Sequence, residues 1–401
     1  MSIITSQGHV QTAEVEFAGR HPDIFSSYVA ADFVKHLAEA VGNDVITQLR
    51  VDINVQSLAQ MYQEGIPTPV MVNLGGQITI PGEVDVHEIA HLSVVEQLKV
   101  AGYLNHIDFS LDNIDVSSHG VTTQSPNLHQ TTQSNRFADS CVCYGHYLAD
   151  SVGLKGTYPS LIISKEIDRV LQEYRETKLP ELRPDGKVHV SIEYQESGFV
   201  VTDIFISVAH AKVIREDWRN ELKAHIIASL PQFHLEQTEF KINAGGDFNV
   251  FFLQADAGVS KAKDNVIVTG GLHQLGTDAM WGKCLYKASS SLIPYAFALS
   301  RAVSEVTGAT YASVSAYAKY GQSQAQLILQ DIDPAFEGKR REINKALAQV
   351  VNDRDGVREI LGMPVSVETY QTFNDPLNFH ESEKPWKRNN QELNEMLKKG
   401  M

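Results

Sequence analysis

A histidine and an aspartate stand at the predicted start of an amphipathic helix, in the stretch AGRHPDIFSSYVAADFVKHLAEAV. Pro22 suits a first helical turn because its missing N–H would have no intrahelical partner there. Apolar side chains then recur at helical spacing, at Phe25, Val29, Phe33, Leu37 and Val41. This spacing predicts a helix over 22–41 with one face on a core. His21 and Asp23 therefore lie beside the free N–H groups of a helix start, where they either cap the helix or serve a ligand.

Lysines occur in three other stretches that are far apart in the sequence. The stretches are LPELRPDGKVHVSIEY with Asp185 and Lys187, ADAGVSKAKDN with Asp256 and Lys263, and WGKCLYKASSS with Lys283 and Lys287. We expect the first pair just before a strand, the second in a loop before the strand NVIVT, and the third on one helix face. A single lysine is typical of a solvated surface. Together with His21, however, these are the residue types that a polyphosphate site needs.

The elements that must position these residues follow no regular βαβα alternation. Each third of the chain combines one or two predicted helices with three or four strands, which is typical of an α+β protein. We predict three similar α+β units, at residues 1–130, 131–252 and 253–401. The predicted helices cover 22–41, 84–103, 158–176, 215–230 and 286–306. The polar C-terminal stretch EKPWKRNNQELNEMLKKGM is expected to form a surface helix or a frayed tail.

The composition limits the class of protein. The chain has 401 residues, of which 43% are hydrophobic, so it can bury a large core. No apolar run approaches the length of a membrane span, and the N-terminus lacks the features of a signal peptide, so a cytoplasmic location is expected. The net charge of −15 argues against a sequence-independent nucleic-acid binder. Cys141, Cys143 and Cys284 form no plausible disulfide framework and are interpreted as reduced thiols.

The stretch HEIAH, residues 87–91, offers a competing interpretation. In H-E-x-x-H on a helix, two histidines would bind zinc and Glu88 would act as a general base. The motif is short, and the chain has 15 histidines, so a chance match is common. No downstream H-x-x-G-x-x-H extension supplies a third ligand. A zinc hydrolase is therefore the weaker hypothesis.

Taken in order along the chain, the lysine-bearing stretches and HPD resemble the S-adenosylmethionine synthetases, also called methionine adenosyltransferases. The resemblance runs from GRHPD near the start to YQTFNDPLNFHESEKPWKR near the end. GGQITI is similar to the family's GGEITT, TTQSPNL to its QSPDI, and LPELRPDGK to its LPWLRPDxK. INAGGDF is similar to INPTGRF, and ADAGVSKAK to GDxGLTGRK. HPD and RPDGK are specific, the glycine-rich stretches are loose, and the ordered series is stronger than any one motif.

The resemblance implies a fold of three α+β domains around a pseudo-threefold axis. It also implies a homodimer or a dimer of dimers with active sites at the interface, with Mg²⁺ and K⁺ as cofactors. In the implied reaction the sulfur of methionine attacks C5′ of ATP and releases triphosphate, which the enzyme then cleaves to phosphate and pyrophosphate. A thioether is already nucleophilic, so the leaving triphosphate is what Lys, His and magnesium must stabilise. The implied partners are ATP and methionine or a related thioether, with no nucleic acid and no membrane.

The family's functional residues match particular positions of this sequence. The resemblance implies that His21 sits on the triphosphate, that Asp23 binds magnesium and that Asp52 belongs to a potassium site. Phosphate oxygens would be held by Lys187, Lys263, Lys283 and Lys287. The nucleoside side would involve Asp185, Asp256 and the adenine-stacking Phe248. The methionine side would involve Gln77, Gln124 and Asp139.

Several departures from the family pattern fall within this implied site. Ala262 replaces an arginine, Ser289 a magnesium-binding aspartate, Ile24 a lysine, Gln77 a glutamate and Asp247 an arginine. The family's flexible loop GGGAFSGKD has become GTDAMWGKC, in which larger residues narrow the loop. Because a neutral hydrogen bond is weaker than a charge-assisted one, Gln77 should weaken recognition of a substrate ammonium group.

These departures leave three hypotheses. The first is a divergent methionine adenosyltransferase. The second is a related ATP-dependent adenosyltransferase that uses another thioether or nucleotide, which Gln77 favours. The third is a non-catalytic paralogue that partners an active subunit, which Ala262 and Ser289 favour but the retained His21 and lysines oppose.

Overall fold

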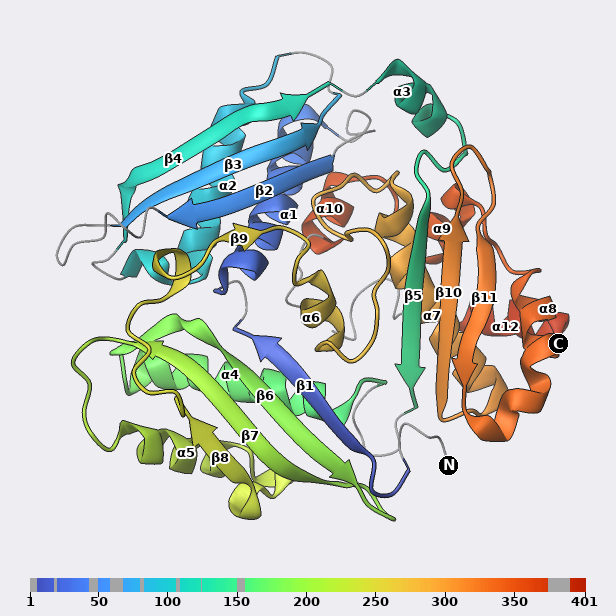
Figure 1. The fold of residues 1–401 in the computed structure, drawn as a ribbon. Helices are drawn as coiled ribbons and strands as arrows, with labels where there is room; N and C mark the ends of the chain where they lie inside the picture. The colour runs from blue at the N-terminus through green and yellow to red at the C-terminus, as the bar shows by residue number, and fades with distance from the viewer. Residues whose placement is uncertain are drawn as a thin grey trace.

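The computed structural model describes residues 6–17, 20–42, 50–57, 68–79, 83–105, 109–123, 125–149, 156–373 and 390–401. Three sheets, each covered by helices, are arranged around a central region that holds the short helix α6 (Figure 1). The predicted α+β fold is thereby confirmed. Among the helices of these residues, none combines the length and apolar character needed to cross a membrane.

One sheet has the strand order β4-β3-β2-β9. Its strands are β2 (Arg50–Ser57), β3 (Thr68–Gln77), β4 (Phe109–Thr122) and β9 (Gly258–Val259). Helices α1 (Pro22–Val41) and α2 (Val86–Val100) lie side by side against it (Figure 1). β2 runs antiparallel to β3, and β3 runs parallel to β4.

A second sheet has the order β1-β6-β7-β8 and its own apolar core. Its strands are β1 (Val10–Glu16), β6 (Leu182–Tyr194), β7 (Phe199–His210) and β8 (Glu239–Ile242). Helix α4 (Pro159–Thr177) packs on β1 and β6, and α5 (Trp218–Ser229) packs on α4.

The third sheet has the order β11-β10-β5. Its strands are β5 (Cys141–Leu148), β10 (Tyr311–Ala318) and β11 (Gln326–Ile332). The buried helix α7 (Ala288–Thr307) packs on β5 and β10. The smaller helices are α3 (Pro126–Gln133), α6 (Asp264–Thr269), α8 (Arg340–Leu347), α9 (Arg354–Ile360), α10 (Val367–Phe373) and α12 (Asn390–Gly400).

Three strands enter sheets whose other strands come from distant parts of the chain. β1, near the N-terminus, pairs with β6, β5 pairs with β10, and β9 pairs with β2. The pairing of β1 with β6 brings the end of β1, and therefore the start of α1, next to the sheet that carries Lys187. The boundaries 1–130, 131–252 and 253–401 remain a prediction.

The long helices agree with the sequence patterns, but three local predictions are wrong. NVIVT forms helix α6 rather than a strand. Its β-branched residues favour strands, but Ile267 and Val268 are buried and Gly270 ends the helix in a left-handed conformation. Lys187 lies inside β6 rather than before it. Lys283 and Lys287 share no helix face, because α7 begins only at Ala288.

The end of the chain and the cysteines also have defined places. The C-terminal residues form α12, which buries Leu393 and Leu397 and is therefore no frayed tail. Cys141, Cys143 and Cys284 are buried free thiols, as predicted. The Sγ atoms of Cys141 and Cys143 are 3.7 Å apart, and hydrogen bonding to Cys141 together with burial raises the pKa of Cys143 well above its usual value.

Candidate functional site

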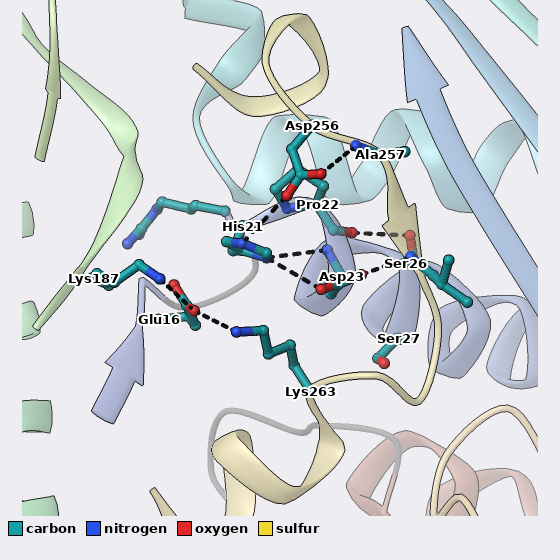
Figure 2. A network of polar contacts seen from close by, with 12 residues as sticks. Glu16, His21, Pro22, Asp23, Ser26, Ser27, Lys187, Asp256, Ala257 and Lys263 are labelled. Carbon is teal, nitrogen blue, oxygen red and sulfur yellow. Dashed lines mark hydrogen bonds and ion pairs between the residues drawn. The ribbon is translucent and has the colours of Figure 1, made fainter. Parts of the chain in front are cut away.

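Five charged or titratable residues from four segments meet near the start of α1, and we call them the Glu16 cluster. They are Glu16, His21, Asp23, Lys187 and Lys263 (Figure 2). Glu16 ends β1 and lies directly opposite Lys187 in the β1–β6 register. His21 precedes the first residue of α1, and Lys263 precedes the first residue of α6. The pairing of β1 with β6 in the second sheet brings these segments together.

Glu16 is the centre of this cluster. Its side chain is fully buried, and its Oε1 atom is 3.3 Å from Lys187 Nζ and 2.8 Å from Lys263 Nζ. Burial alone would raise the pKa of Glu16, but His21, Glu14 and the two lysines lower it to about 2. Burial alone would lower the pKa of Lys263, but the neighbouring carboxylates of Glu16 and Glu14 raise it. The carboxylate of Glu16 and the ammonium group of Lys263 are therefore both ionised.

His21 does cap α1, and it also faces two carboxylates. Its Nδ1 atom accepts a hydrogen bond of 3.2 Å from the N–H of Asp23. Asp23 Oδ2 lies 3.9 Å from Nδ1, and Asp256 Oδ2 lies 3.9 Å from Nε2 on the other side of the ring (Figure 2). Burial lowers the pKa of His21, although Glu16 and Asp23 oppose this shift. The ring therefore lies between the two lysines and the carboxylates of Asp23 and Asp256.

Asp23 does not cap its own helix. Its Oδ1 atom accepts a hydrogen bond of 2.9 Å from the N–H of Val259, which fixes β9 against the start of α1. Asp256 accepts from the N–H of Ala257 and keeps 62% of its side chain exposed. Each carboxylate thus has one oxygen bound to backbone and one turned toward His21. Two such oxygens suit a hard cation such as Mg²⁺, which usually takes one or two protein carboxylates plus phosphate and water.

Lys283 lies in a different environment, which we call the Lys283 cluster. Its side chain is fully buried, forms an ion pair with Asp278 and donates a hydrogen bond of 3.1 Å to Ser289 Oγ. The Ser289 hydroxyl in turn donates to Asp278 Oδ2 at 3.4 Å. Lys287 is also buried and precedes α7.

A third buried carboxylate connects α1 with the segment that carries Lys283. Asp264 Oδ1 accepts a hydrogen bond of 2.8 Å from Ser27 Oγ. Burial raises the pKa of Asp264 to about 6, and a hydrogen bond from the backbone of Met280 and the charge of Lys283 oppose that rise. Asp264 therefore holds α1, α6 and the loop before Lys283 together.

Two of the predicted nucleoside residues, Asp185 and Phe248, contact other parts of this chain, and their role toward a nucleoside, like that of Asp256, remains a prediction. Asp185 is buried, and its Oδ2 atom accepts a hydrogen bond of 2.7 Å from the N–H of Phe252. Burial raises the pKa of Asp185 to about 7. Phe252 has a positive φ of 50°, so this hydrogen bond helps to hold an unfavourable backbone conformation. Phe248 donates its N–H to His210 Nε2 at 3.1 Å, and its ring is half-buried against the core.

Among the described residues, the predicted methionine residues Gln77 and Asp139 form no hydrogen bond or ion pair with the Glu16 cluster. Gln77 ends β3 and is half-buried, and Asp139 accepts a hydrogen bond of 2.8 Å from the N–H of Ser140. Gln124 lies outside the described residues, as does the side chain of Asp52, whose backbone pairs with Gly75. The roles of these four residues remain predictions.

The HEIAH stretch forms the first turns of α2. Asp85 caps this helix by accepting hydrogen bonds of 3.0 Å from the N–H groups of His87 and Glu88. His87 is exposed and His91 is half-buried. In the part of the chain that the structure describes, the motif belongs to no group of three metal-ligating side chains. The geometry therefore gives no support to a zinc hydrolase at this motif.

Sequence reasoning missed three acidic residues that organise these clusters. Glu16 lies in a segment that matches no motif, whereas Asp264 and Asp278 lie in the quoted stretches ADAGVSKAKDN and GTDAMWGKC but were not expected to pair with a lysine or a hydroxyl. Only Glu16 gave a local signal, since it and Glu14 alternate with apolar residues in a strand-like stretch and therefore share one face. Pairing across such distances along the chain cannot be read from spacing.

Comparisons with known proteins agree on one family. A family model described as the central domain of S-adenosylmethionine synthetase matches residues 158–248. An S-adenosylmethionine synthase from Clostridium tetani is 35% identical over 129 residues, which are 31% of this chain and 33% of that protein. Another from Corynebacterium aurimucosum is 26% identical over 253 residues, which are 56% of this chain and 60% of that protein. The chain thus aligns with less than two thirds of either relative's length.

The fold can also be compared over the whole chain. A solved structure described as an unusual S-adenosylmethionine synthetase from Campylobacter jejuni matches with a TM-score of 0.77. The match covers 98% of this chain and 100% of that one, at 18% sequence identity. At this identity the likeness establishes a shared fold, and the sequence matches above supply the link to the family.

Proposed function

We propose, from the premise that the chain is a divergent member of the S-adenosylmethionine synthetase family, that it is a methionine adenosyltransferase. It would form S-adenosylmethionine from ATP and methionine and cleave the released triphosphate to phosphate and pyrophosphate. The observation that carries the proposal is the convergence of His21, Lys187 and Lys263 around Glu16. Two cationic side chains and an imidazole from distant segments are what a departing polyanion requires.

The chemistry needs positioning and charge rather than a general base. A lone pair on the thioether sulfur forms the S–C5′ bond while the C5′–O bond breaks, and that electron pair leaves on the triphosphate. Negative charge on the leaving group grows in the transition state, so cations held near it lower the barrier. Water then cleaves one P–O–P linkage of the triphosphate.

The Glu16 cluster is suited to this task because its lysines are held in place before any ligand binds. Glu16 fixes the Nζ atoms of Lys187 and Lys263 within 3.3 Å of one carboxylate oxygen. Both lysines keep part of their side chains exposed, 35% and 25% respectively, so they can still reach phosphate oxygens. Holding charged groups in place reduces the reorganisation needed when charge develops.

Magnesium would bind beside His21, at the carboxylates of Asp23 and Asp256. Asp23 and Asp256 each turn one carboxylate oxygen toward His21, which fits a cation shared with phosphate. When bound, Mg²⁺ would neutralise charge on the polyphosphate. We include K⁺ in the proposal on the family resemblance alone, through Asp52.

A homodimer or a dimer of dimers, with active sites at the interface, is part of the proposal. In such an assembly the residues of one chain need not all meet within that chain. This accounts for the separation of Gln77, Asp139 and Lys283 from the Glu16 cluster.

One observation favours the alternative of a related adenosyltransferase with another thioether. Lys283 is neutralised by Asp278 in a fully buried pair, so it offers less to a phosphate than the other lysines. Gln77 also presents a neutral amide where a carboxylate would meet the substrate ammonium. A non-catalytic paralogue would bind ATP without turnover.

The test is mass spectrometry of the products formed from ATP and a panel of thioethers, with Mg²⁺ and K⁺ present. We expect S-adenosylmethionine, phosphate and pyrophosphate with methionine, and none of them with His21→Ala. Turnover only with another thioether would establish the alternative adenosyltransferase. Binding of ATP without any product would rule out both enzymatic functions.

A further inference from the structure

The contact between helices α1 and α2 contains a group of potential metal ligands far from the Glu16 cluster. Within the described residues, the ligand atoms of Asp32, His36 and Glu96 all lie within 4.8 Å of one another, and no other three His, Cys, Asp or Glu side chains do so. Asp32 and His36 are one turn apart on α1, and Glu96 faces them from α2. At 1.5 Å per residue, the group lies about 15 Å along α1 from its start.

The distances within the group suit a small divalent ion. His36 Nε2 is 3.2 Å from Asp32 Oδ2 and 3.1 Å from Glu96 Oε2. Two ligands bound to zinc at about 2.0–2.1 Å with tetrahedral angles are about 3.3 Å apart. His36 Nε2 thus already lies at ligand spacing from both carboxylates, and the two carboxylate oxygens lie within 4.8 Å of each other.

The histidine is oriented as metal-binding histidines usually are. Its other ring nitrogen, Nδ1, lies 3.2 Å from Glu39 Oε2. A carboxylate on the second nitrogen of a metal-binding histidine orients the ring, and here it turns Nε2 toward Asp32 and Glu96. Glu39 is itself held by Gln371, whose amide donates a hydrogen bond of 3.0 Å to Oε1.

Asp32 is the most deeply buried of the three ligands. Its side chain is 92% buried, and its Oδ2 atom makes no hydrogen bond within the described residues but forms an ion pair with His36 Nε2 at 3.2 Å. A buried carboxylate oxygen that lacks a hydrogen bond is costly, and a cation bound between Asp32 and His36 would remove that cost.

Charge favours a dication at the same place. Asp32, Glu39 and Glu96 contribute three negative charges, and Lys35 contributes one positive charge, so the group carries −2 while His36 is neutral. Lys35 Nζ lies 3.2 Å from Asp32 Oδ1 and 3.9 Å from Glu96 Oε2, where it would compete with a metal ion.

We propose that Asp32, His36 and Glu96 form a metal site for a divalent transition ion of the zinc type, which joins α1 to α2. One imidazole and two carboxylates are the mixed donor set that such ions accept, whereas Mg²⁺ and Ca²⁺ prefer oxygen alone. The fourth position would be held by water, because Glu96 keeps 42% of its side chain exposed. The inference does not depend on the proposed adenosyltransferase activity.

The experiment is titration of the tag-free, chelator-treated protein with Co²⁺ in the absence of nucleotide, followed by visible absorption and then by displacement with Zn²⁺. We expect about one Co²⁺ per chain and a rise in melting temperature with either ion. His36→Gln and Glu96→Gln should each weaken binding at least tenfold, as loss of a ligand does. Glu96→Gln keeps the test valid if His36→Gln fails to fold, since Glu96 is partly exposed.

Two further variants separate a metal site from an ion-pair cluster. Lys35→Gln should strengthen Co²⁺ binding several-fold because it removes the competing charge, whereas a pure ion-pair cluster would only lose stability. His91→Gln, on the neighbouring face of α2, is the matched control and should bind like the unchanged protein. The proposal is overturned if Co²⁺ does not bind stoichiometrically, if His36→Gln binds equally well, or if a thiolate charge-transfer band places the ion on cysteine.

Discussion

The Glu16 cluster and the Lys283 cluster each pair lysine with a carboxylate, but they differ in exposure and in stoichiometry. In the first, two partly exposed lysines share one buried carboxylate, and His21 lies beside them. In the second, one lysine with no exposed side-chain surface is matched by one carboxylate and one hydroxyl. The first therefore has ammonium groups that a ligand can reach, whereas the ammonium group of the second is buried against its carboxylate.

The comparison teaches that matched residue types do not define a binding site until their partners are known. Both clusters contain lysines that the family resemblance assigns to phosphate. Their surroundings differ because Asp278 and Ser289 both bind the buried Nζ of Lys283, while a single oxygen of Glu16 binds both Lys187 and Lys263. The variants below test this difference.

The largest effect is expected from Asp278→Asn, which removes the charge partner of buried Lys283. Breaking a buried ion pair on one side usually costs about 3–5 kcal/mol because the remaining charge is left unpaired. We expect a loss of unfolding free energy of that size in chemical denaturation.

A double variant makes this prediction specific. Asp278→Asn combined with Lys283→Met removes both charges, so it should recover much of the lost stability. Unchanged stability together with weaker ATP binding in Asp278→Asn would instead mean that Lys283 belongs to an open anion site, and the contrast between the clusters would fail.

The next largest effect is expected from Lys263→Met, in the Glu16 cluster. Loss of one group that stabilises transition-state charge typically costs a factor of about 10²–10³ in rate. We expect kcat/KM for ATP and methionine to fall by roughly this factor while Lys187 keeps Glu16 paired and the protein folded.

Lys241→Met is the matched control for this variant. Lys241 lies on β8 and pairs with Glu239 and Asp203 at the surface, so its loss should leave kcat/KM nearly unchanged. Equal rates for Lys263→Met and the unchanged protein would exclude Lys263 from the reaction.

How far these clusters could be predicted from sequence depends on the range of the interactions. Helix α1 and its start at His21 and Pro22 follow from local rules of spacing and proline placement, and the structure confirms them. The α+β fold was predictable from the mixture of patterns along the chain. Local periodicity carries this information because it reflects neighbours three or four residues apart.

The partners of the lysines could not be predicted in the same way. Glu16 meets Lys263 across 247 residues, and that contact exists only because β1 joins the second sheet. The strand prediction for NVIVT failed because burial of Ile267 and Val268 overrides the weak strand preference of β-branched residues. Asp278 and Lys283 lie in an irregular segment, where no periodic rule applies.

The buried carboxylates of Glu16 and Asp185 differ in how their ionisation makes the stability of the protein depend on pH. Lys187 and Lys263 keep Glu16 ionised, whereas burial raises the pKa of Asp185 to about 7. In the unfolded chain this aspartate titrates near 3.8. Because its folded pKa is the higher one, its stabilising contribution is fully present below about pH 4 and is lost as pH rises through about 7.

Asp185→Asn should therefore flatten the stability profile between about pH 4 and pH 7. The amide keeps an oxygen for the N–H of Phe252 and cannot ionise. We expect the difference in unfolding free energy between the two proteins to change by on the order of 3 kcal/mol over that range. Parallel profiles would mean that Asp185 is ionised throughout and shares the lysines with Glu16.

The smallest effect is expected from Ser289→Ala, which tests whether the Lys283 cluster is purely structural. The hydroxyl accepts a hydrogen bond from Lys283 and donates one to Asp278, but the ion pair between those two residues stays. The loss should be about 1.5–3 kcal/mol of unfolding free energy, as for a hydrogen bond to a charged group. The KM for ATP should not change, because the hydroxyl then serves only the buried pair. A higher KM at unchanged stability would place Ser289 on the ligand, and the Lys283 cluster would have to open when the nucleotide binds.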